Sequence, residues 1–225
     1  MKRRKVDNSI ISMKSMKFQS VDIIDPPLKL NPSFFDVDVF SLAKNLLGKI
    51  LVRINDDNSR ISGKIIETES YDGLNDPASH SYKGETIRNK AMFMGSGTVY
   101  VYYIYGLNHC INITGKEIGT AVLIRSLEPV EGIDKMIKYR KLKNIRSDKQ
   151  LCNGPVKLCQ SLNLTKEFNQ KNICNLNNLW IEDCNDTFDV VNASRIGVNG
   201  YGEKASNCLY RYYIKGNSYV SKINK

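Results

Sequence analysis

The chain contains 225 residues, of which 41% are hydrophobic, so it can bury the core of one large domain and global disorder is excluded. Its 33 basic and 23 acidic residues give a formal net charge of +10, which favours a polyanionic partner, nucleic acid before a membrane surface. No run of about 18 apolar residues occurs, so we expect no membrane-spanning helix. The basic N-terminal residues are not followed by the apolar stretch of a signal peptide.

The six cysteines are scattered along the chain, and none of them forms a C-x-x-C pair. The two histidines, His80 and His109, do not stand at metal-ligand spacing from any cysteine. We therefore expect reduced thiols, no metal and no other cofactor. For a chain without targeting segments, these features predict a cytoplasmic, nucleoid-associated protein, or a nuclear one in a eukaryotic source.

Two regions are distinguished by composition. Residues 1–28 are predicted to form a flexible basic arm that ends at Pro26-Pro27, and residues 29–225 the folded domain. In chain order, hydrophobic periodicity and turn residues predict a helix at 33–47, strands at 49–54, 61–71, 98–105, 108–114 and 120–127, helices at 131–144 and 155–162, and strands at 179–183, 189–195 and 210–220.

The predicted connections decide the fold class. Polar turn residues at 55–59 and the pair Gly106-Leu107 predict two hairpins, and the strands are mostly not separated by crossover helices. This pattern favours a single α+β domain, an antiparallel sheet with peripheral helices, over a doubly wound parallel sheet. The polar loop at 72–97 is unusually long for a compact domain, and loops of this length are usually functional.

The strand at 61–71 ends in two carboxylates and a tyrosine on one face, because alternate residues of a strand point to the same side. These residues are Glu67, Glu69 and Tyr71. Two interpretations are open: the acids are solvated where the strand leaves the core, or one of them is a general base facing the long loop. His80, which follows shortly in that loop, favours the second.

An arginine among apolar neighbours in the strand at 120–127 needs an acceptor, because an unpaired buried charge is very costly. This residue is Arg125, and Glu67 or Glu69 is the candidate acceptor. The pair is either purely structural or part of a site.

The strand at 98–105 is rich in tyrosine. Tyr100 and Tyr102 are predicted on one face and Tyr103 on the other. Tyrosines are good strand formers, and they also provide platforms on which nucleobases stack. Tyr105, beside Gly106 at the hairpin tip, is placed to wedge between base pairs.

The long loop offers candidate contacts to a DNA backbone. Arg88 and Lys90 are candidate phosphate ligands. Met92 follows them as a further candidate DNA contact, or together with Phe93 it pins an ordinary basic loop.

In this order along the chain, the residues resemble the alkyladenine (3-methyladenine) DNA glycosylase family, the monofunctional purine glycosylases. The resemblance runs from about residue 33 to the C-terminus. It rests on Glu67-Thr68-Glu69-Ser70-Tyr71, His80-Ser81, Arg88-Asn89, Met92-Phe93-Met94, Gly97-Thr98, Tyr100-Val101-Tyr102, Tyr105-Gly106, Cys110-Ile111-Asn112-Ile113, Val122-Leu123-Ile124-Arg125, Leu127-Glu128-Pro129, Gly154-Pro155-Val156-Lys157-Leu158-Cys159 and Arg195-Ile196-Gly197-Val198.

The resemblance implies a curved antiparallel sheet with an open-barrel-like core and a protruding hairpin. It implies a monomeric base excision repair enzyme that acts on damaged double-stranded DNA. Such an enzyme flips alkylated or deaminated purines from the duplex and hydrolyses the N-glycosidic bond, which leaves an abasic site without lyase activity. The substrates are of the 3-methyladenine, 7-methylguanine, hypoxanthine and ethenoadenine type.

The resemblance also implies residue roles. Glu69 is the general base that activates water, and Arg125 and the Ile196 carbonyl help to hold that water. Tyr71, His80 and Tyr102 sandwich the flipped base. Tyr105 fills the gap that the base leaves in the duplex, and the Asn112 amide excludes normal guanine.

Two other functions compete with this one. A non-catalytic nucleic-acid-binding module would use the same basic and tyrosine-rich surface, and Glu69 would then be dispensable. A zinc-dependent nucleobase deaminase requires His-x-Glu and Pro-Cys-x-x-Cys ligand patterns, and the chain has neither.

Overall fold

The computed structural model describes residues 29–223, so the predicted arm at 1–28 lies outside the described residues. The strands are β1 Ile50–Ile54, β2 Arg60–Tyr71, β3 Val99–Ile104, β4 Asn108–Ile113, β5 Ala121–Glu131, β6 Leu179–Glu182, β7 Val190–Ala193 and β8 Arg211–Ile214. They form one sheet in the order β3-β4-β5-β2-β1-β6, and β8 pairs with both β2 and β7.

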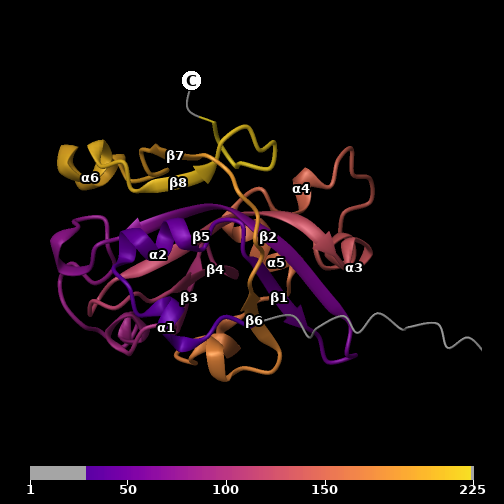
Figure 1. The fold of residues 1–225 in the computed structure, drawn as a ribbon, viewed down its shortest axis with the longest axis horizontal. Coiled ribbons are helices and arrows are strands. Elements are labelled where there is room, and N and C mark those ends of the chain that lie inside the picture. The colour runs from indigo at the N-terminus through magenta and orange to yellow at the C-terminus, as the bar shows by residue number, and fades with distance from the viewer. Residues whose placement is uncertain (1–28, 224–225) are drawn as a thin grey trace, which may run out of the picture.

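Every strand pair in this sheet is antiparallel, and the sheet curls into a half-barrel (Figure 1). Both predicted hairpins occur, β1–β2 and β3–β4. The predicted single α+β domain with a protruding hairpin is therefore confirmed.

The helices surround the sheet and are short. They are α1 Pro32–Phe35, α2 Val39–Asn45, α3 Ile133–Tyr139, α4 Lys149–Cys152, α5 Pro155–Ser161 and α6 Glu203–Asn207, with single 3-10 turns at Gly73–Asn75, Lys90–Phe93, Lys166–Phe168, Ile173–Asn175 and Asn199–Tyr201. Apolar residues of α2 and α5 pack with the strands in the main hydrophobic core. Figure 1 shows β7, β8 and α6 together along one side of the half-barrel.

Several predicted boundaries are wrong. The single helix predicted at 33–47 is two helices, because the Asp38 carboxylate accepts hydrogen bonds from the N–H groups of Phe40 and Ser41 and starts a new helix. The strand predicted at 120–127 continues to Glu131, and the helix predicted to end at residue 144 ends at Tyr139. The strand predicted at 210–220 ends at Ile214. Helices α4 and α6, of four and five residues, are too short to leave a periodic pattern.

Strand β2, with 12 residues, organises the sheet because it pairs with three neighbours. It pairs with β1 near its start, with β8 at Glu67–Glu69, and with β5 along its other edge. The register against β5 shifts on both sides of Glu67, and such irregularities re-aim side chains. The acidic end of β2 is therefore enclosed by strands on both edges.

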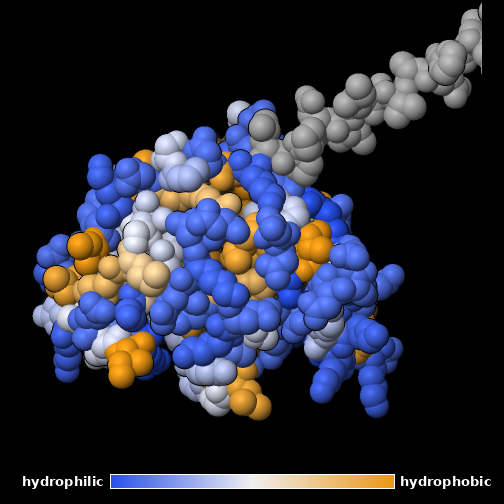
Figure 2. All heavy atoms as spheres, turned by 90° about the horizontal axis from the view of Figure 1, so that it is seen from below, coloured by the Kyte–Doolittle hydropathy of each residue, from blue (hydrophilic) through white to orange (hydrophobic). Residues whose placement is uncertain are grey.

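The face shown in Figure 2 is mostly hydrophilic, and its apolar side chains form separate patches. Within residues 29–223, no helix is long and apolar enough to cross a bilayer. All six cysteines fall in this range, and each is a free thiol.

Candidate active site

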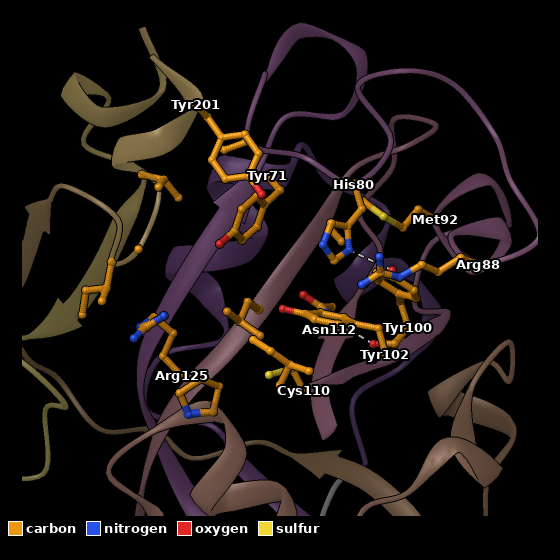
Figure 3. Close-up of a pocket in the computed structure, with 18 of the residues that line it drawn as sticks. Tyr71, His80, Arg88, Met92, Tyr100, Tyr102, Cys110, Asn112, Arg125 and Tyr201 are labelled. Carbon is orange, nitrogen blue, oxygen red and sulfur yellow. Dashed lines mark hydrogen bonds between the residues drawn. The ribbon is translucent and has the colours of Figure 1, made fainter. Parts of the chain in front are cut away.

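A cavity of about 410 Å³ opens beside the β3–β4 hairpin. It brings together residues from distant parts of the chain: β2, the loop after β2, β3, β4, β5 and the loop after β7. In Figure 3, Tyr71 lies on one side of this cavity with Arg125 below it, and His80 and Tyr102 lie on the other side, with Asn112 beside Tyr102. All five were predicted site residues.

Glu69 lies directly behind the cavity wall and is fully buried. Its carboxylate accepts hydrogen bonds from the Tyr71 hydroxyl (2.9 Å), an Arg125 guanidinium N–H (3.2 Å) and the Ile196 backbone N–H (2.7 Å). All three donors line the cavity. A carboxylate has about four acceptor sites, so one more donor, such as a water, can be bound.

A second buried acid, Glu67, extends this cluster away from the cavity. Its carboxylate accepts from Arg211 (2.8 Å), from the Ser221 backbone N–H (2.7 Å) and, at 3.4 Å, from Arg125. Burial opposes the charge of Arg125, but Glu69 and Glu67 outweigh this effect and raise its pKa. The acids are therefore not solvated, and two arginines balance their two charges.

The wall opposite Tyr71 is aromatic. The ring centroids of His80 and Tyr102 lie 4.6 Å apart, edge to face, and the His80 Nδ1 lies 2.9 Å from the Tyr100 hydroxyl. Although His80 is exposed at the cavity mouth, desolvation and then the charge of Arg88 lower its pKa to about 4. Burial raises the pKa of Tyr100 to about 12, so its hydroxyl stays protonated beside Nδ1. With a pKa of about 4, the His80 ring is neutral at physiological pH.

Burial and the charge of Glu69 raise the pKa of Tyr71 well above its usual value, so Tyr71 stays protonated and donates to Glu69. Burial also raises the pKa of Cys110, which lines the cavity, to about 11. A thiol with this pKa is not a thiolate nucleophile at neutral pH. Glu69 is then the strongest candidate base among the groups at this cavity.

The hairpin tip projects from the mouth of the cavity. Tyr105 is 88% exposed and lines the cavity rim, with a φ of +47° that is uncommon for a bulky residue. Such backbone strain is often found at functional sites. Gly106, at φ +84°, completes the turn, and Tyr103 points to the other side of the hairpin against His109.

The candidate phosphate ligands differ in position. Arg88 is exposed at the cavity, with its guanidinium 5.8 Å from the Tyr102 ring centroid. Lys90 is exposed but does not line the cavity. Met92 is buried and packs with Tyr100 in the cavity wall, so it is not part of the outer surface.

Asn112 lies at the cavity base, and its side-chain NH2 donates to the Tyr100 carbonyl (3.0 Å). This hydrogen bond holds the amide in place at the cavity wall. The Asn112 side chain therefore cannot rotate away from the cavity without losing a buried hydrogen bond.

Sequence reasoning left several residues of this site without a role. Tyr201, half-exposed on a glycine-rich loop, lines the cavity beyond Tyr71 (Figure 3). Arg195 and Asp76 form a buried ion pair, with Arg195 next to the Tyr71 ring, and Arg211 supports Glu67. The run Arg195-Ile196-Gly197-Val198 signalled the loop, but no local pattern revealed its partners.

Within the described part of the chain, no group of three or more His, Cys, Asp and Glu side chains is placed to hold a metal ion. The C-terminal segment beyond β8 contributes the Ser221 N–H to Glu67. The Tyr219 carbonyl accepts from Ser126, and the Tyr219 hydroxyl donates to Asp148 at 3.0 Å. These contacts hold the C-terminal segment against Glu67 of β2 and Ser126 of β5.

Comparisons with known proteins identify the family of this chain. The model of the methylpurine-DNA glycosylase (MPG) family matches residues 33–218. A putative 3-methyladenine DNA glycosylase of Clostridium novyi (strain NT) is 43% identical over 202 residues, 86% of this chain and 98% of the relative. The DNA-3-methyladenine glycosylase of Mus musculus is 39% identical over 223 residues, 94% of this chain and 66% of the mouse protein. The chain belongs to the methylpurine-DNA glycosylase family and is a DNA glycosylase, a hydrolase of base excision repair.

Proposed function

We propose that this enzyme flips alkylated or deaminated purines from double-stranded DNA and hydrolyses their N-glycosidic bond with a water activated by Glu69. The observation that supports this most directly is an aromatic-walled cavity in front of a buried carboxylate held by Arg125, Tyr71 and the Ile196 N–H. The substrates are of the 3-methyladenine, 7-methylguanine, hypoxanthine and ethenoadenine type. The enzyme acts as a monomer where DNA is found, in the nucleoid or the nucleus.

The aromatic walls support selection of a flat, electron-poor ring. Tyr71 on one side and His80 with Tyr102 on the other leave a slot into which a purine can stack. Alkylation at ring nitrogen makes a purine cationic, and a cation is attracted to electron-rich aromatic faces. Flipping is also least costly for damaged or mispaired bases, so part of the selectivity is thermodynamic.

The hydrolytic step follows from the groups around Glu69. Glu69 takes a proton from water as the water oxygen bonds to C1′ of the deoxyribose, and the purine leaves with the bonding electrons. The carboxylate also stabilises the oxocarbenium charge that develops on the sugar, as in glycoside hydrolysis. Arg125 and the Ile196 carbonyl complete the water site. The cavity lining, all of it within the described residues, contains no lysine that could form a Schiff base with the sugar, which supports monofunctional chemistry.

Asn112 supports discrimination against normal guanine. Because its amide is fixed by the Tyr100 carbonyl, it would crowd the exocyclic amino group of guanine. Hypoxanthine lacks that group, so it fits where guanine is repelled. Rejection by a clash of this kind raises specificity without tightening the binding of the correct base.

A direct assay tests this function. A duplex carrying one hypoxanthine is incubated with the enzyme, and abasic sites are then cleaved with alkali and resolved on a gel. Cleavage that appears only after alkali is the expected result. No cleavage with hypoxanthine or ethenoadenine duplexes, despite tight binding, would favour the non-catalytic binding module.

Tyr105→Ala should lower the fraction of lesion bases that are flipped, because Tyr105 is proposed to fill the gap in the duplex. We expect about a tenfold loss, equal to about 1.4 kcal/mol, with little change in binding to undamaged DNA. The fluorescence of ethenoadenine, which responds to unstacking, measures this equilibrium. Tyr82→Ala, a half-exposed tyrosine that does not line the cavity, is the matched control. Equal losses in flipping and in undamaged-DNA binding would count against a wedge.

His80 should titrate far below the usual histidine range, because desolvation and the charge of Arg88 lower its pKa to about 4. It therefore stays neutral from pH 8 down to about 5, and protonation of this ring should not reduce hypoxanthine excision there. With only two histidines in the chain, NMR titration with a His109→Gln variant for assignment reads the midpoint directly. Arg88→Ala should raise the midpoint. A His80 midpoint near 6.5 in the native protein would contradict this assignment.

A further inference from the structure

A buried ion pair lies behind the cavity wall and does not line the cavity itself. The Arg195 and Asp76 side chains are 0% and 2% exposed, and two guanidinium N–H groups donate to the two carboxylate oxygens, the second at 2.8 Å. Asp76 also accepts from the Ala78 backbone N–H at 3.0 Å. This residue therefore ties Arg195 to the start of the loop that carries His80.

Arg195 also reaches the acidic end of β2 at two points. Its Nη1 donates to the Ser70 carbonyl at 3.1 Å, and Ser70 stands between Glu69 and Tyr71 in sequence. Its guanidinium carbon lies 4.7 Å from the centroid of the Tyr71 ring, within range of a cation–π interaction. The arginine thus fixes both the strand backbone and the aromatic wall.

Arg195 is also linked through the backbone to a hydrogen-bond donor of Glu69. The residue after Arg195 is Ile196, whose N–H donates to the Glu69 carboxylate at 2.7 Å. The placement of Arg195 therefore decides where this donor stands. Burial opposes the positive charge, but the hydrogen bonds and charge of Asp76 outweigh it and raise the pKa of Arg195, so the ion pair persists across the physiological range.

Stability alone does not account for this arrangement. Apolar side chains of similar volume often stabilise a protein as well as a buried ion pair does, because desolvation offsets the attraction of the charges. An apolar side chain cannot donate to Asp76 and to Ser70 at once while it lies over Tyr71. The planar guanidinium, with its five fixed donors, suits a junction where three groups must keep their relative positions.

We propose that Arg195, held by Asp76, is a positioning residue for base excision that keeps Tyr71 and the Ile196 N–H aligned with Glu69. This inference rests on the proposed roles of Glu69 and Tyr71. Loss of the guanidinium lets the aromatic wall and the carboxylate shift relative to each other. A displacement of about 1 Å at reacting groups costs about 10²-fold in rate.

The test compares single-turnover excision of hypoxanthine at saturating enzyme for the wild type, Arg195→Lys and Arg195→Met. With enzyme in excess, this rate constant reports only the folded molecules, so a reduced folded fraction does not change it. We expect about a 10²-fold loss for Arg195→Met, a smaller loss for Arg195→Lys, and unchanged binding of undamaged duplex. Arg60→Met is the matched control, because Arg60 pairs with the buried Glu182 away from the cavity.

A rate constant for Arg195→Met equal to that of the wild type would overturn the inference and leave the proposed function intact. If Arg195→Met does not fold, Asp76→Asn decides: it keeps the side-chain shape but removes the charge, and an unchanged rate would likewise overturn the inference. A wild-type enzyme that excises neither hypoxanthine nor ethenoadenine would overturn the proposed function, and the inference with it.

Discussion

Glu69→Gln should reduce single-turnover excision by about 10³-fold, since general-base catalysis contributes 10²–10⁴-fold, while lesion DNA remains bound. Glutamine keeps the shape of the side chain, and its one carbonyl oxygen can replace Oε2, which accepts from Tyr71 and Arg125, while its NH2 takes the place of Oε1 and loses the hydrogen bond from the Ile196 N–H. It cannot take a proton from water. The loss should therefore fall on the chemical step and not on binding of the duplex.

The measurement pairs the alkali-cleavage assay with a binding titration on the same hypoxanthine duplex. Glu182→Gln is the matched control, because Glu182 is also a buried glutamate bound by an arginine, but it lies on β6 away from the cavity. Its excision rate should stay within about twofold of the wild type. A Glu69→Gln enzyme that retains more than a tenth of the wild-type rate would remove Glu69 from the role of base.

Arg211→Met should lower the free energy of unfolding by about 3–5 kcal/mol, because it leaves Glu67 as a buried charge without its main partner. Both side chains are fully buried, and the Arg211 Nη1 donates to Glu67 at 2.8 Å. Arg125 cannot replace Arg211, because the Arg125 Nε lies 3.4 Å from the Glu67 carboxylate and its Nη1 already donates a hydrogen bond to Glu69. Arg211 also donates to the Ser194 carbonyl at 2.8 Å, which would lose its partner.

Urea unfolding followed by the fluorescence of Trp180, the single tryptophan, measures this effect. Lys215→Met is the control: the Lys215–Asp189 pair is 3.5 Å long and mostly exposed, so its loss should change stability by less than about 0.5 kcal/mol. A double variant, Glu67→Gln with Arg211→Met, should recover part of the loss because it also removes the charge that is left alone. An Arg211→Met protein as stable as Lys215→Met would mean that Glu67 is not held as a charged group.

The sequence alone predicted the parts of the fold that depend on neighbours along the chain. Alternation in β2 put Glu67, Glu69 and Tyr71 on one face, and the contacts of Arg125 with both acids agree with that face. The Gly106 turn predicted the β3–β4 hairpin, whose two faces carry Tyr102 and Tyr103 as expected. These features follow from the period of two residues in a strand and from the backbone freedom of glycine.

Tertiary structure decided how the acids are used. Whether Glu67 and Glu69 are solvated or buried depends on Arg211 and on the Ile196 and Ser221 N–H groups, which are more than 100 residues away in sequence. The pairing of Asp76 with Arg195 is equally remote. No local pattern encodes such partners, because a buried charge is stable only where the whole fold brings its counter-charge and donors within hydrogen-bonding distance.

Two element boundaries had local signals that could have been recognised in the sequence. The start of α2 depends on a local cap, Asp38, and the end of β8 at Ile214 comes just before the turn residues Gly216 and Asn217. Beyond Ile214 the chain turns to place Tyr219 and Ser221 against Ser126 and Glu67. The hydrogen bonds of these residues are made with distant side chains and not as backbone pairs with a neighbouring strand. Local sequence therefore determined the strands and the hairpin of this glycosylase, and long-range burial of charge determined its site.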